Sequence, residues 1–378
     1  MDIELFIEKN KNLINNQVIT IKNGMAYINL TRYTVLNESL IKQIIGSINF
    51  FYKKFGKNKI HIVLNFGKLD ILDKLSYILI ECICYHIITV YHQAVSIIMV
   101  DNYGIWTEGI LSSPLLLLKT GKKHHLEKFI QKFNNDIYHN HYRRIIHNND
   151  DQYYLCNIMA EIDSFLKYFS VDENSRDNLA KVVVELVGNA KEHADGDSLI
   201  DIDIAPSYLK RDEEGEFYGV NFVVLNFSNK LMGHGIETKI HQCSTDRYQK
   251  VMDAYNNHKQ HFSETYIEQD FFTIASFQDK ISGTLEKSVT GGKGLTFLIS
   301  SLENRSHTYC CYLLSGNRIL LFKHDILEYN KDGWIGFNDV NDFINNIPKS
   351  TVIGEGQYYF PGTAYNLNFI LRKEDSNE

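Results

Sequence analysis

The sequence predicts a mixed α/β protein with two domains, and three observations support this fold class. The chain has 378 residues, of which 44% are hydrophobic and 22% are charged, which is enough for more than one hydrophobic core. In the N-terminal third, strand-like and helix-like segments alternate. In the C-terminal half, a helical pattern at 181–194 precedes strand patterns at 217–228 and 360–371. Helices and strands in this order are expected to pack as a helical layer on a sheet, so we predict α/β domains of the two-layer α+β kind.

The N-terminal domain is predicted to span residues 1–115. Its strand-like segments are MAYINL (25–30), HIVLNF (61–66) and AVSIIMV (94–100), and its helical patterns lie at 39–52 and 75–90. Strands that alternate with helices indicate an α/β layer. The second helical pattern is too short for a comfortable membrane span and contains Glu81 and His86, so we expect a buried helix.

The net charge and the N-terminal residues argue against a nucleic-acid-binding protein and against a secreted one. The net charge of -7 provides no broad positive field, which argues against a nucleic-acid partner. The first residues, MDIELFIEKNKN, lack the basic and apolar regions of a signal peptide. With no membrane span expected, we predict a cytoplasmic protein.

Residues 116–150 are predicted to be a connecting helical segment. Its basic residues are Lys122, Lys123, Lys128, Lys132, Arg143 and Arg144. We interpret this basic stretch as a solvated helix rather than a nucleic-acid surface. His139 and His141 form an H-x-H pair of the kind that binds metals, but the sequence supplies no convincing further ligands.

The stretch KVVVELVGNAKEHA at 181–194 places polar residues within an apolar helical pattern. Positions four residues apart lie on one face of a helix, so Glu185 and Asn189 project together, with His193 one turn further. Burying such a pair without partners costs too much free energy. The pattern therefore indicates that Glu185 and Asn189 line a pocket for a polar ligand.

This stretch resembles the N box, E-x-x-x-N-A, of the GHKL superfamily of ATP-binding proteins, which includes DNA gyrase B, sensor histidine kinases and anti-sigma-factor kinases. Glu185, Asn189 and Ala190 match the box, and His193 falls where anti-sigma kinases commonly carry histidine. The resemblance is nearest to the anti-sigma-factor kinases. It implies a Bergerat-type ATP-binding α/β sandwich at 151–378, with Asn189 holding Mg²⁺ and Glu185 as the catalytic carboxylate that orients or deprotonates a water.

A second box of the same family is similar to TGGKGLTFLISSL at 290–302, where a glycine-rich turn leads into a helical pattern. Glycines permit close backbone approach, and a helix N-terminus presents unpaired N–H groups to an anion. The backbone of Gly292, Lys293, Gly294 and Leu295 would then bind phosphates, with Lys293 as an adjacent cation. The alternative is a loop that only turns the chain.

A third box resembles FPGTAYNLNFIL at 360–371, in which Gly362 and Thr363 precede an alternating strand pattern. In the family, a Gly-Thr pair at this place closes the adenine pocket. The resemblance implies that Thr363 offers its hydroxyl to the adenine-binding residue or to its water.

The sequence departs from the family at the adenine-reading box, D-x-G-x-G, because no aspartate stands there. The strand pattern at 217–228 has Asn226 near its end, and its amide oxygen would accept from the adenine amino group, while its NH₂ needs a separate partner. In a second alignment, Gly233 and Gly235 are the paired glycines and Leu231 takes the acidic position, which removes the hydrogen bond. The ligand is therefore ATP, another adenine nucleotide, or no nucleotide.

Residues 236–290 occupy the place of the family's mobile lid. A lid that orders on nucleotide binding would couple the ligand state to the shape of the surface. The alternative is a static helical insertion.

The N-terminal stretch HIVLNFGKLDILDKLSYILIECI resembles the central strand, loop and helix of STAS domains, the modules that partner anti-sigma kinases. Phosphorylated STAS proteins carry a serine after the loop aspartate, whereas here Lys74 and Leu75 follow Asp73 and Ser76 is displaced. A docking or scaffold role toward a protein partner is expected in place of a phosphorylation switch, and a homodimer is left open.

These resemblances lead to two functional hypotheses. In the first, the C-terminal domain binds Mg-ATP and acts as a nucleotide-dependent conformational switch, with slow hydrolysis, that signals to a protein partner. In the second, a degenerate domain of the same fold binds no nucleotide and serves as a protein-interaction module. A serine kinase like those of the anti-sigma factors is a variant of the first hypothesis.

Overall fold

The computed structural model describes most of the chain. The described residues are 1–14, 19–56, 59–71, 74–100, 113–138, 140–150, 153–194, 196–208, 215–242, 248–279, 281, 295, 298–299 and 311–373. Within these ranges, the side chains of residues 138, 193, 194, 206–208 and 372 lie outside the description.

The N-terminal half forms a mixed sheet with helices, in the order that the sequence predicts. The strands are β1 (Ile19–Lys22), β2 (Met25–Asn29), β4 (His61–Asn65) and β6 (Val95–Ile98), in the spatial order β1-β2-β4-β6. β1 is antiparallel to β2, whereas β2, β4 and β6 are parallel. The helices are α1 (Ile3–Lys9), α2 (Glu38–Phe55) and α3 (Lys74–Thr89), and β3 (Val35–Leu36) pairs with β5 (Asp70–Ile71). The predicted helices at 39–52 and 75–90 correspond to α2 and α3.

The sequence also explains where these helices begin. The Asn37 side chain accepts a hydrogen bond from the backbone N–H of Leu40 at 3.2 Å and so caps α2. α3 buries nearly its whole length, including Glu81 and His86, as expected for an internal helix. Among the described residues, no helix is both long and apolar enough to cross a membrane.

The C-terminal half contains an antiparallel sheet of six strands. The strands are β7 (Asn135–Tyr138), β8 (His141–Ile146), β9 (Ser198–Tyr208), β10 (Phe217–Phe227), β11 (Tyr312–Leu321) and β12 (Ile353–Arg372), in the spatial order β11-β12-β10-β9-β8-β7. The predicted connecting segment at 116–150 is therefore only partly helical. It contains the 3₁₀ helix η2 (Pro114–Lys119) and α4 (Lys123–Asn134), and then the hairpin β7–β8 adds two strands to the sheet through pairing of β8 with β9.

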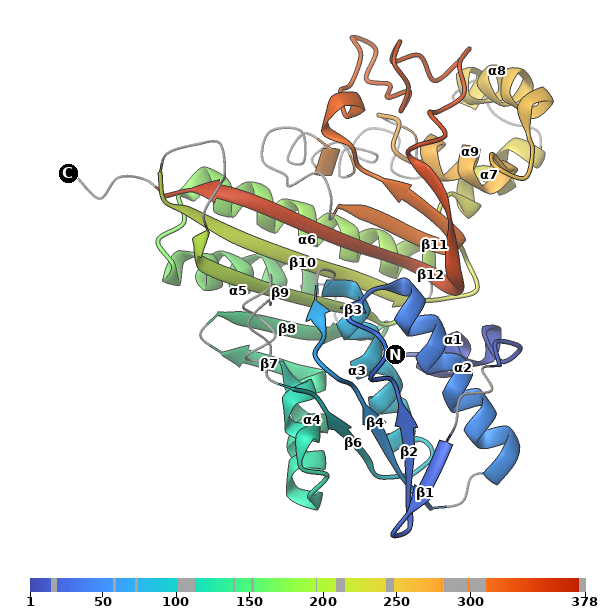
Figure 1. Ribbon diagram of the computed structural model, residues 1–378. Coiled ribbons are helices and arrows are strands. Elements are labelled where there is room, and N and C mark those ends of the chain that lie inside the picture. Colours follow the sequence, from blue (N-terminus) through green and yellow to red (C-terminus); the bar gives the residue numbers. More distant parts are fainter. Residues whose placement is uncertain are drawn as a thin grey trace.

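Helices cover both faces of this sheet (Figure 1), whereas the prediction was a two-layer sandwich. α5 (Tyr154–Tyr168) and α6 (Glu173–Ala194) cover one face, and the N-terminal half packs against the other. β10 shows the reason, because all eleven of its residues are buried. Val220, Phe222 and Val224 face the cluster with α5 and α6, and Val223, Leu225 and Phe227 face the N-terminal helices.

Aromatic side chains join α1 to the end of the sheet. The ring of Phe6 stacks on Phe227 with centroids 5.7 Å apart, and it also contacts Tyr358 and Phe360. All four side chains are buried. The two halves of the chain therefore share one hydrophobic core at this face.

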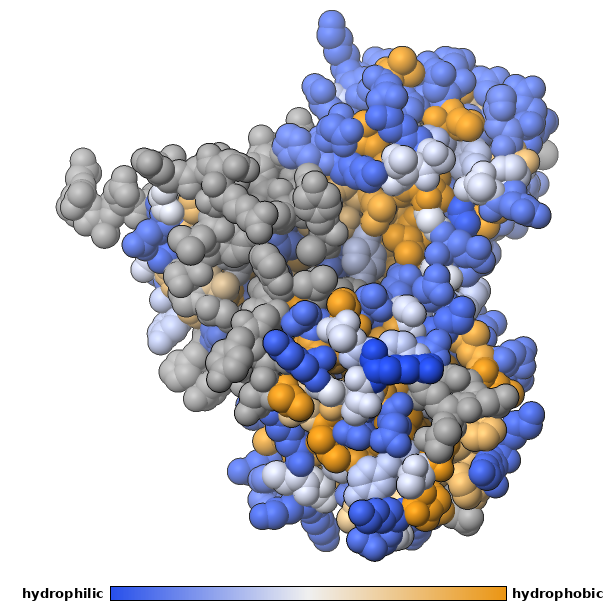
Figure 2. Space-filling model, viewed as in Figure 1, coloured by the Kyte–Doolittle hydropathy of each residue, from blue (hydrophilic) through white to orange (hydrophobic). Residues whose placement is uncertain are grey.

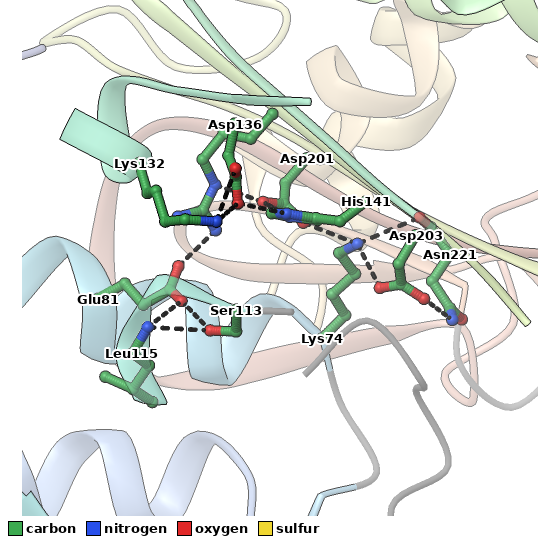
Figure 3. Close-up of polar contacts among 11 residues, drawn as sticks. Lys74, Glu81, Ser113, Leu115, Lys132, Asp136, His141, Asp201, Asp203 and Asn221 are labelled. Carbon is green, nitrogen blue, oxygen red and sulfur yellow. Dashed lines mark hydrogen bonds and ion pairs between the residues drawn. The ribbon is translucent and has the colours of Figure 1, made fainter. Parts of the chain in front are cut away.

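A buried network of charged residues lies next to this core, between α3 and strands β8 and β9 (Figure 3). Lys74 Nζ lies 2.7 Å from Asp201 Oδ1 and also contacts Asp203. Arg143 bridges Asp201 and Glu81, so that both halves contribute charges of both signs. All five side chains are at most 2% exposed.

His141 extends this network to β7. Its Nε2 lies 2.9 Å from Asp201 and its Nδ1 lies 3.2 Å from Asp136, which also contacts Lys132 at 2.9 Å. Burial disfavours the charged ring, but Asp201 and Asp136 together raise the pKa of His141 above its usual value. Burial would likewise raise the pKa of Asp201, but Arg143, Lys74 and His141 hold it well below its usual range. The interpretation of the basic stretch as a solvated helix is therefore wrong for Arg143, which is fully buried.

The described residues between β10 and β11, together with the loop-rich residues 322–352, form a helical module at the end of the sheet (Figure 1), and its buried side chains continue the core of α5 and α6. Its helices are α7 (His234–His241), α8 (Gln249–His258) and α9 (Glu268–Ala275). Phe271 stacks on Phe343 with centroids 5.2 Å apart, and Arg318 on β11 forms a buried bidentate ion pair with Asp270. The described part of the predicted lid is thus packed as a static helical insertion would be, while residues 243–247, 280 and 282–290 lie outside the described residues.

A buried histidine makes this module sensitive to acid. His258 is 1% exposed, its Nε2–H donates to the Phe343 carbonyl at 2.8 Å, and its Nδ1 accepts from the Tyr266 hydroxyl. These partners select the neutral ring, and burial lowers the pKa of His258 to about 4.

Acidification is therefore expected to destabilise the module. Because the folded-state pKa is lowered, the contribution of His258 is complete above the usual pKa of 6.5 and is lost as the pH falls toward 4. The loss between pH 7 and pH 4.5 is about 2–3 kcal/mol and can be measured by urea denaturation. His258→Gln keeps a donor and an acceptor but does not titrate, so its stability should change less over this range. Equal pH profiles for the two proteins would contradict the assignment.

Candidate functional site

A cavity of about 390 Å³ lies where α6, the C-terminal end of β10, the middle of β12 and α7 meet. Its volume is within the range of small-molecule sites. Figure 2 shows that the outer surface of the helical module is mostly hydrophilic, with hydrophobic residues where the module meets the sheet. The cavity is lined by Glu185, Leu186, Asn189, Ala190, Glu192, Asn226, Lys230, Leu231, Met232, Gly233, His234, Gly235, Ile236, Thr238, Lys239, Ser276, Ile281, Leu295, Thr363 and Tyr365.

Helix α6 contributes the polar pair that the sequence predicts. Glu185 and Asn189 are both half-buried and both line the cavity, one turn apart. Val182, Val183 and Val187, with almost no exposed surface, pack into the core and fix the rotation of the helix. The expectation that Glu185 and Asn189 share a face is confirmed. His193 lies in α6, but its side chain lies outside the described residues.

The second polar pair comes from the sheet. Asn226 on β10 is directly opposite Thr363 on β12 in the antiparallel register, and both line the cavity. Asn226 is only 3% exposed, and its Nδ2 has no hydrogen-bond partner among the described residues. A buried amide donor without a partner is unfavourable. Because Nδ2 has under 1 Å² of exposed surface, it can meet a ligand in the cavity only after the amide turns.

Gly362 makes the close contact of the two strands possible. Its φ is +100°, and a Cβ atom at this position would lie 2.3 Å from the backbone oxygen of Asn226 and 3.0 Å from its Nδ2. No side chain fits this space without displacing backbone atoms. The glycine before Thr363 is therefore required by the packing at this end of the cavity.

The two alignments of the adenine-reading box do not exclude each other. Asn226 lines the cavity, and so do Leu231, Gly233 and Gly235. Gly233 has a φ of +82° at the start of α7, and a Cβ there would lie 2.3 Å from the Phe272 carbonyl oxygen. The structure thus brings both candidate segments to the same cavity.

The glycine-rich turn can be placed only in part. Gly292, Lys293 and Gly294 lie outside the described residues. Leu295 lines the cavity, and Leu298 and Ile299 are buried in the core that includes α6. Leu295, Leu298 and Ile299, three apolar positions of the predicted helical pattern, are therefore buried, and Leu302 lies outside the described residues.

Several cavity residues were not predicted. Tyr365 follows Thr363 by two positions on β12, so the period of two of a strand places both on one face, and this signal was available in the sequence. Burial and the nearby Glu185 carboxylate raise the pKa of Tyr365. Lys239 on α7 makes no ion pair with the described residues, but no motif singles it out.

The polar groups around the cavity therefore divide by chemistry. The carboxylate of Glu185 and the amide of Asn189 lie on α6, the amide of Asn226 and the hydroxyl of Thr363 lie on the sheet, and the ammonium of Lys239 lies on α7. The other polar lining residues are Glu192, Lys230, His234, Thr238 and Ser276. Such an arrangement suits a ligand with a hydrogen-bonding planar part and a separate anionic part.

A group of possible metal ligands lies outside the cavity lining. Ligand atoms of Glu237, His241 and Glu268 lie within 4.8 Å of one another on the surface between α7 and α9. His241 Nε2 already lies 3.4 Å from Glu268, and the Tyr255 hydroxyl donates to the same carboxylate. These ion-pair and hydrogen-bond contacts account for the group without a metal.

No family model, curated protein or solved structure matches this chain. The functional argument therefore depends on the cavity and on the residues that line it.

Proposed function

We propose that the C-terminal half, residues 151–378 with the added hairpin, is a GHKL-type domain with a Bergerat fold that binds ATP with Mg²⁺ in this cavity. The observation that carries the proposal is the convergence of three segments that are far apart in the sequence. Glu185 and Asn189 on α6, Asn226 on β10 and Thr363 on β12 line one cavity, together with Leu295. The motif resemblance requires this convergence, and hydrophobic packing alone does not explain why these four polar side chains, among others, line one hollow.

The lining residues suit the parts of a nucleotide. Asn226 and Thr363 would hold the base. Lys239 would contribute positive charge near the phosphates, together with Lys293 in the glycine-rich turn at 292–294. Mg²⁺ prefers oxygen ligands and is usually held by one or two protein side chains plus phosphates and waters. Asn189, with Glu185 one turn away, fits such a site. The ion would neutralise phosphate charge when bound.

Glu185 is the candidate catalytic group. Its carboxylate lines the cavity and is close enough to Tyr365 to raise the pKa of that hydroxyl. In the proposed function it orients or deprotonates a water, and turnover is slow because positioning carries most of phosphoryl transfer. A serine kinase activity would require a protein acceptor at the same site.

The N-terminal half, with its STAS-like pattern, is proposed to connect nucleotide state to a protein partner. It packs on the sheet face opposite α6, and the cavity lies between α6 and the helical module. A ligand would contact both α6 and α7 and so stabilise one relative position of these elements. Ser76 is 1% exposed on α3, so a docking role fits this domain better than phosphorylation at that serine.

Calorimetric titration with ATP and Mg²⁺ tests the proposal. Wild-type protein is expected to bind, and Asn189→Ala is expected to bind at least about tenfold more weakly, because a phosphate-linked metal contact is lost. Asn174→Ala is the matched control, since Asn174 is exposed on the same helix. Glu185→Gln should retain binding and lose phosphate release.

The results separate the two functional hypotheses. Binding that is equal in wild type and Asn189→Ala would remove the assigned metal site. The absence of binding in folded wild-type protein would favour the nucleotide-free interaction module, whose supporting feature is the missing aspartate of the adenine-reading box.

A further inference from the structure

We propose that Asn226 allows the cavity to accept both 6-amino and 6-oxo purine nucleotides, so that ATP and GTP bind with similar affinity. This inference rests on the proposed nucleotide function. It concerns the selectivity of the base position and not the existence of the site.

The side chain of Asn226 is fixed by packing but makes no hydrogen bond with the described residues. It is 97% buried at the cavity wall, between the strand pairing of β10 and the backbone of Gly362. Among the described residues, no group hydrogen-bonds to its Nδ2 and none donates to its Oδ1. Desolvation of this amide is therefore uncompensated until a ligand supplies partners.

An amide can meet either type of purine edge. Adenine presents an amino donor beside a ring-nitrogen acceptor, and guanine presents a carbonyl acceptor beside a ring N–H donor. The Asn226 amide carries one acceptor oxygen and an NH₂ donor, and a half-turn of the amide exchanges their positions. Because no described hydrogen bond fixes the amide, this rotation breaks no contact with the protein. A carboxylate at the same place would only accept, so it would pair with the adenine amino group or with the N1–H and 2-amino groups of guanine, but never with the guanine carbonyl.

The neighbouring polar group has the same property. Thr363 lies directly opposite Asn226 in the strand register, and a hydroxyl both donates and accepts. The backbone groups nearby are already used, since the Ser228 N–H donates to the Pro361 carbonyl and the Gly362 carbonyl accepts from Ser315. A base held at this position would therefore meet two adaptable side chains, beside the backbone groups of Ser228 and Gly362 that are already paired.

The test is calorimetric titration of the full chain with Mg-ATP and Mg-GTP at pH 8, in wild type and Asn226→Asp. Wild type is expected to bind the two nucleotides with affinities that differ by less than about tenfold, since each base edge offers one donor and one acceptor. Asn226→Asp is expected to change the ratio of the ATP and GTP affinities by at least about tenfold, because the carboxylate can no longer donate to the guanine carbonyl or to a ring nitrogen of adenine. Asn174→Asp, on the exposed side of α6, should leave the ratio unchanged.

The possible outcomes are distinct. A wild-type preference for ATP of a hundredfold or more would overturn the inference while the nucleotide site stands, and this result does not depend on whether the variant folds. An unchanged ratio in folded Asn226→Asp would overturn the role of Asn226. The absence of binding of either nucleotide to folded wild type would overturn the proposed function itself.

Discussion

Replacing Lys74 with methionine is expected to lower the free energy of unfolding by about 3–5 kcal/mol. The ammonium group lies between Asp201 and Asp203, which have no exposed surface, and Lys74 itself is 2% exposed. Without it, the partners that remain for the two carboxylates among the described residues are Arg143, His141 and Asn221. An uncompensated buried charge is among the most destabilising changes in a protein. Urea denaturation measures the loss.

Lys123→Met is the matched control for this prediction. The Lys123 side chain is 91% exposed and forms only a 3.9 Å pair with Glu127, so its loss should cost less than about 1 kcal/mol. Asp203→Asn combined with Lys74→Met should recover part of the stability, because one of the two stranded charges is removed. Equal unfolding midpoints for Lys74→Met and Lys123→Met would show that the network does not stabilise the fold.

Replacing Gly362 with alanine is expected to destabilise the protein by more than about 2 kcal/mol and to abolish ligand binding in the cavity. The new Cβ would lie 2.3 Å from the Asn226 backbone oxygen and 2.9 Å from the Ser228 nitrogen, and the φ of +100° is unfavourable for alanine. Relief of this clash must separate β10 from β12 where Asn226 and Thr363 meet. Urea denaturation and nucleotide titration measure the two effects.

Gly354→Ala controls for the substitution itself. Gly354 lies on the same strand, and a Cβ there meets no atom within 4 Å, so the change in stability should stay within about 1 kcal/mol. A Gly362→Ala protein that unfolds at the same urea concentration as Gly354→Ala would show that the strands tolerate the added methyl group.

The parts of the site that the sequence predicts are those set by short-range geometry. Glu185 and Asn189 lie one turn apart on a helix, so their shared face follows from spacing alone. Thr363 follows a glycine in an alternating pattern, which predicts a strand, although the structure places it in the middle of β12 and not at the start of a strand. The same reasoning would have found Tyr365 two positions later.

The buried charge network could not be predicted because its partners are distant in the sequence. The alternating stretch LIDIDIA at 199–205 is typical of a strand with one solvated face, so Asp201 and Asp203 read as exposed residues. Their burial depends on Lys74, which is 129 positions from Asp203, and on Arg143, which is 58 positions from Asp201. Only the packing of the N-terminal half on this face makes the aspartates internal.

The helical module could not be predicted from the sequence for a different reason. Residues 322–352 show no regular period, and their fold depends on individual side chains that bond to backbone groups. The Asn338 amide donates to the carbonyls of Gly336, Asp342 and Asn346, and Gln278 bonds to Ile335. Contacts of this kind leave no repeating pattern in a sequence.

The shared face of the six-stranded sheet has a practical consequence for producing fragments of this protein. A clone cut at residue 150 would discard β7 and β8 and would leave β9 as an unpaired edge. Even a longer clone that keeps the hairpin but omits residues 1–115 would expose Leu225, Phe227 and Phe360 to solvent beside two aspartates that have lost Lys74. Such a fragment should aggregate when expressed alone, and co-expression with residues 1–115 as a separate chain should rescue its solubility.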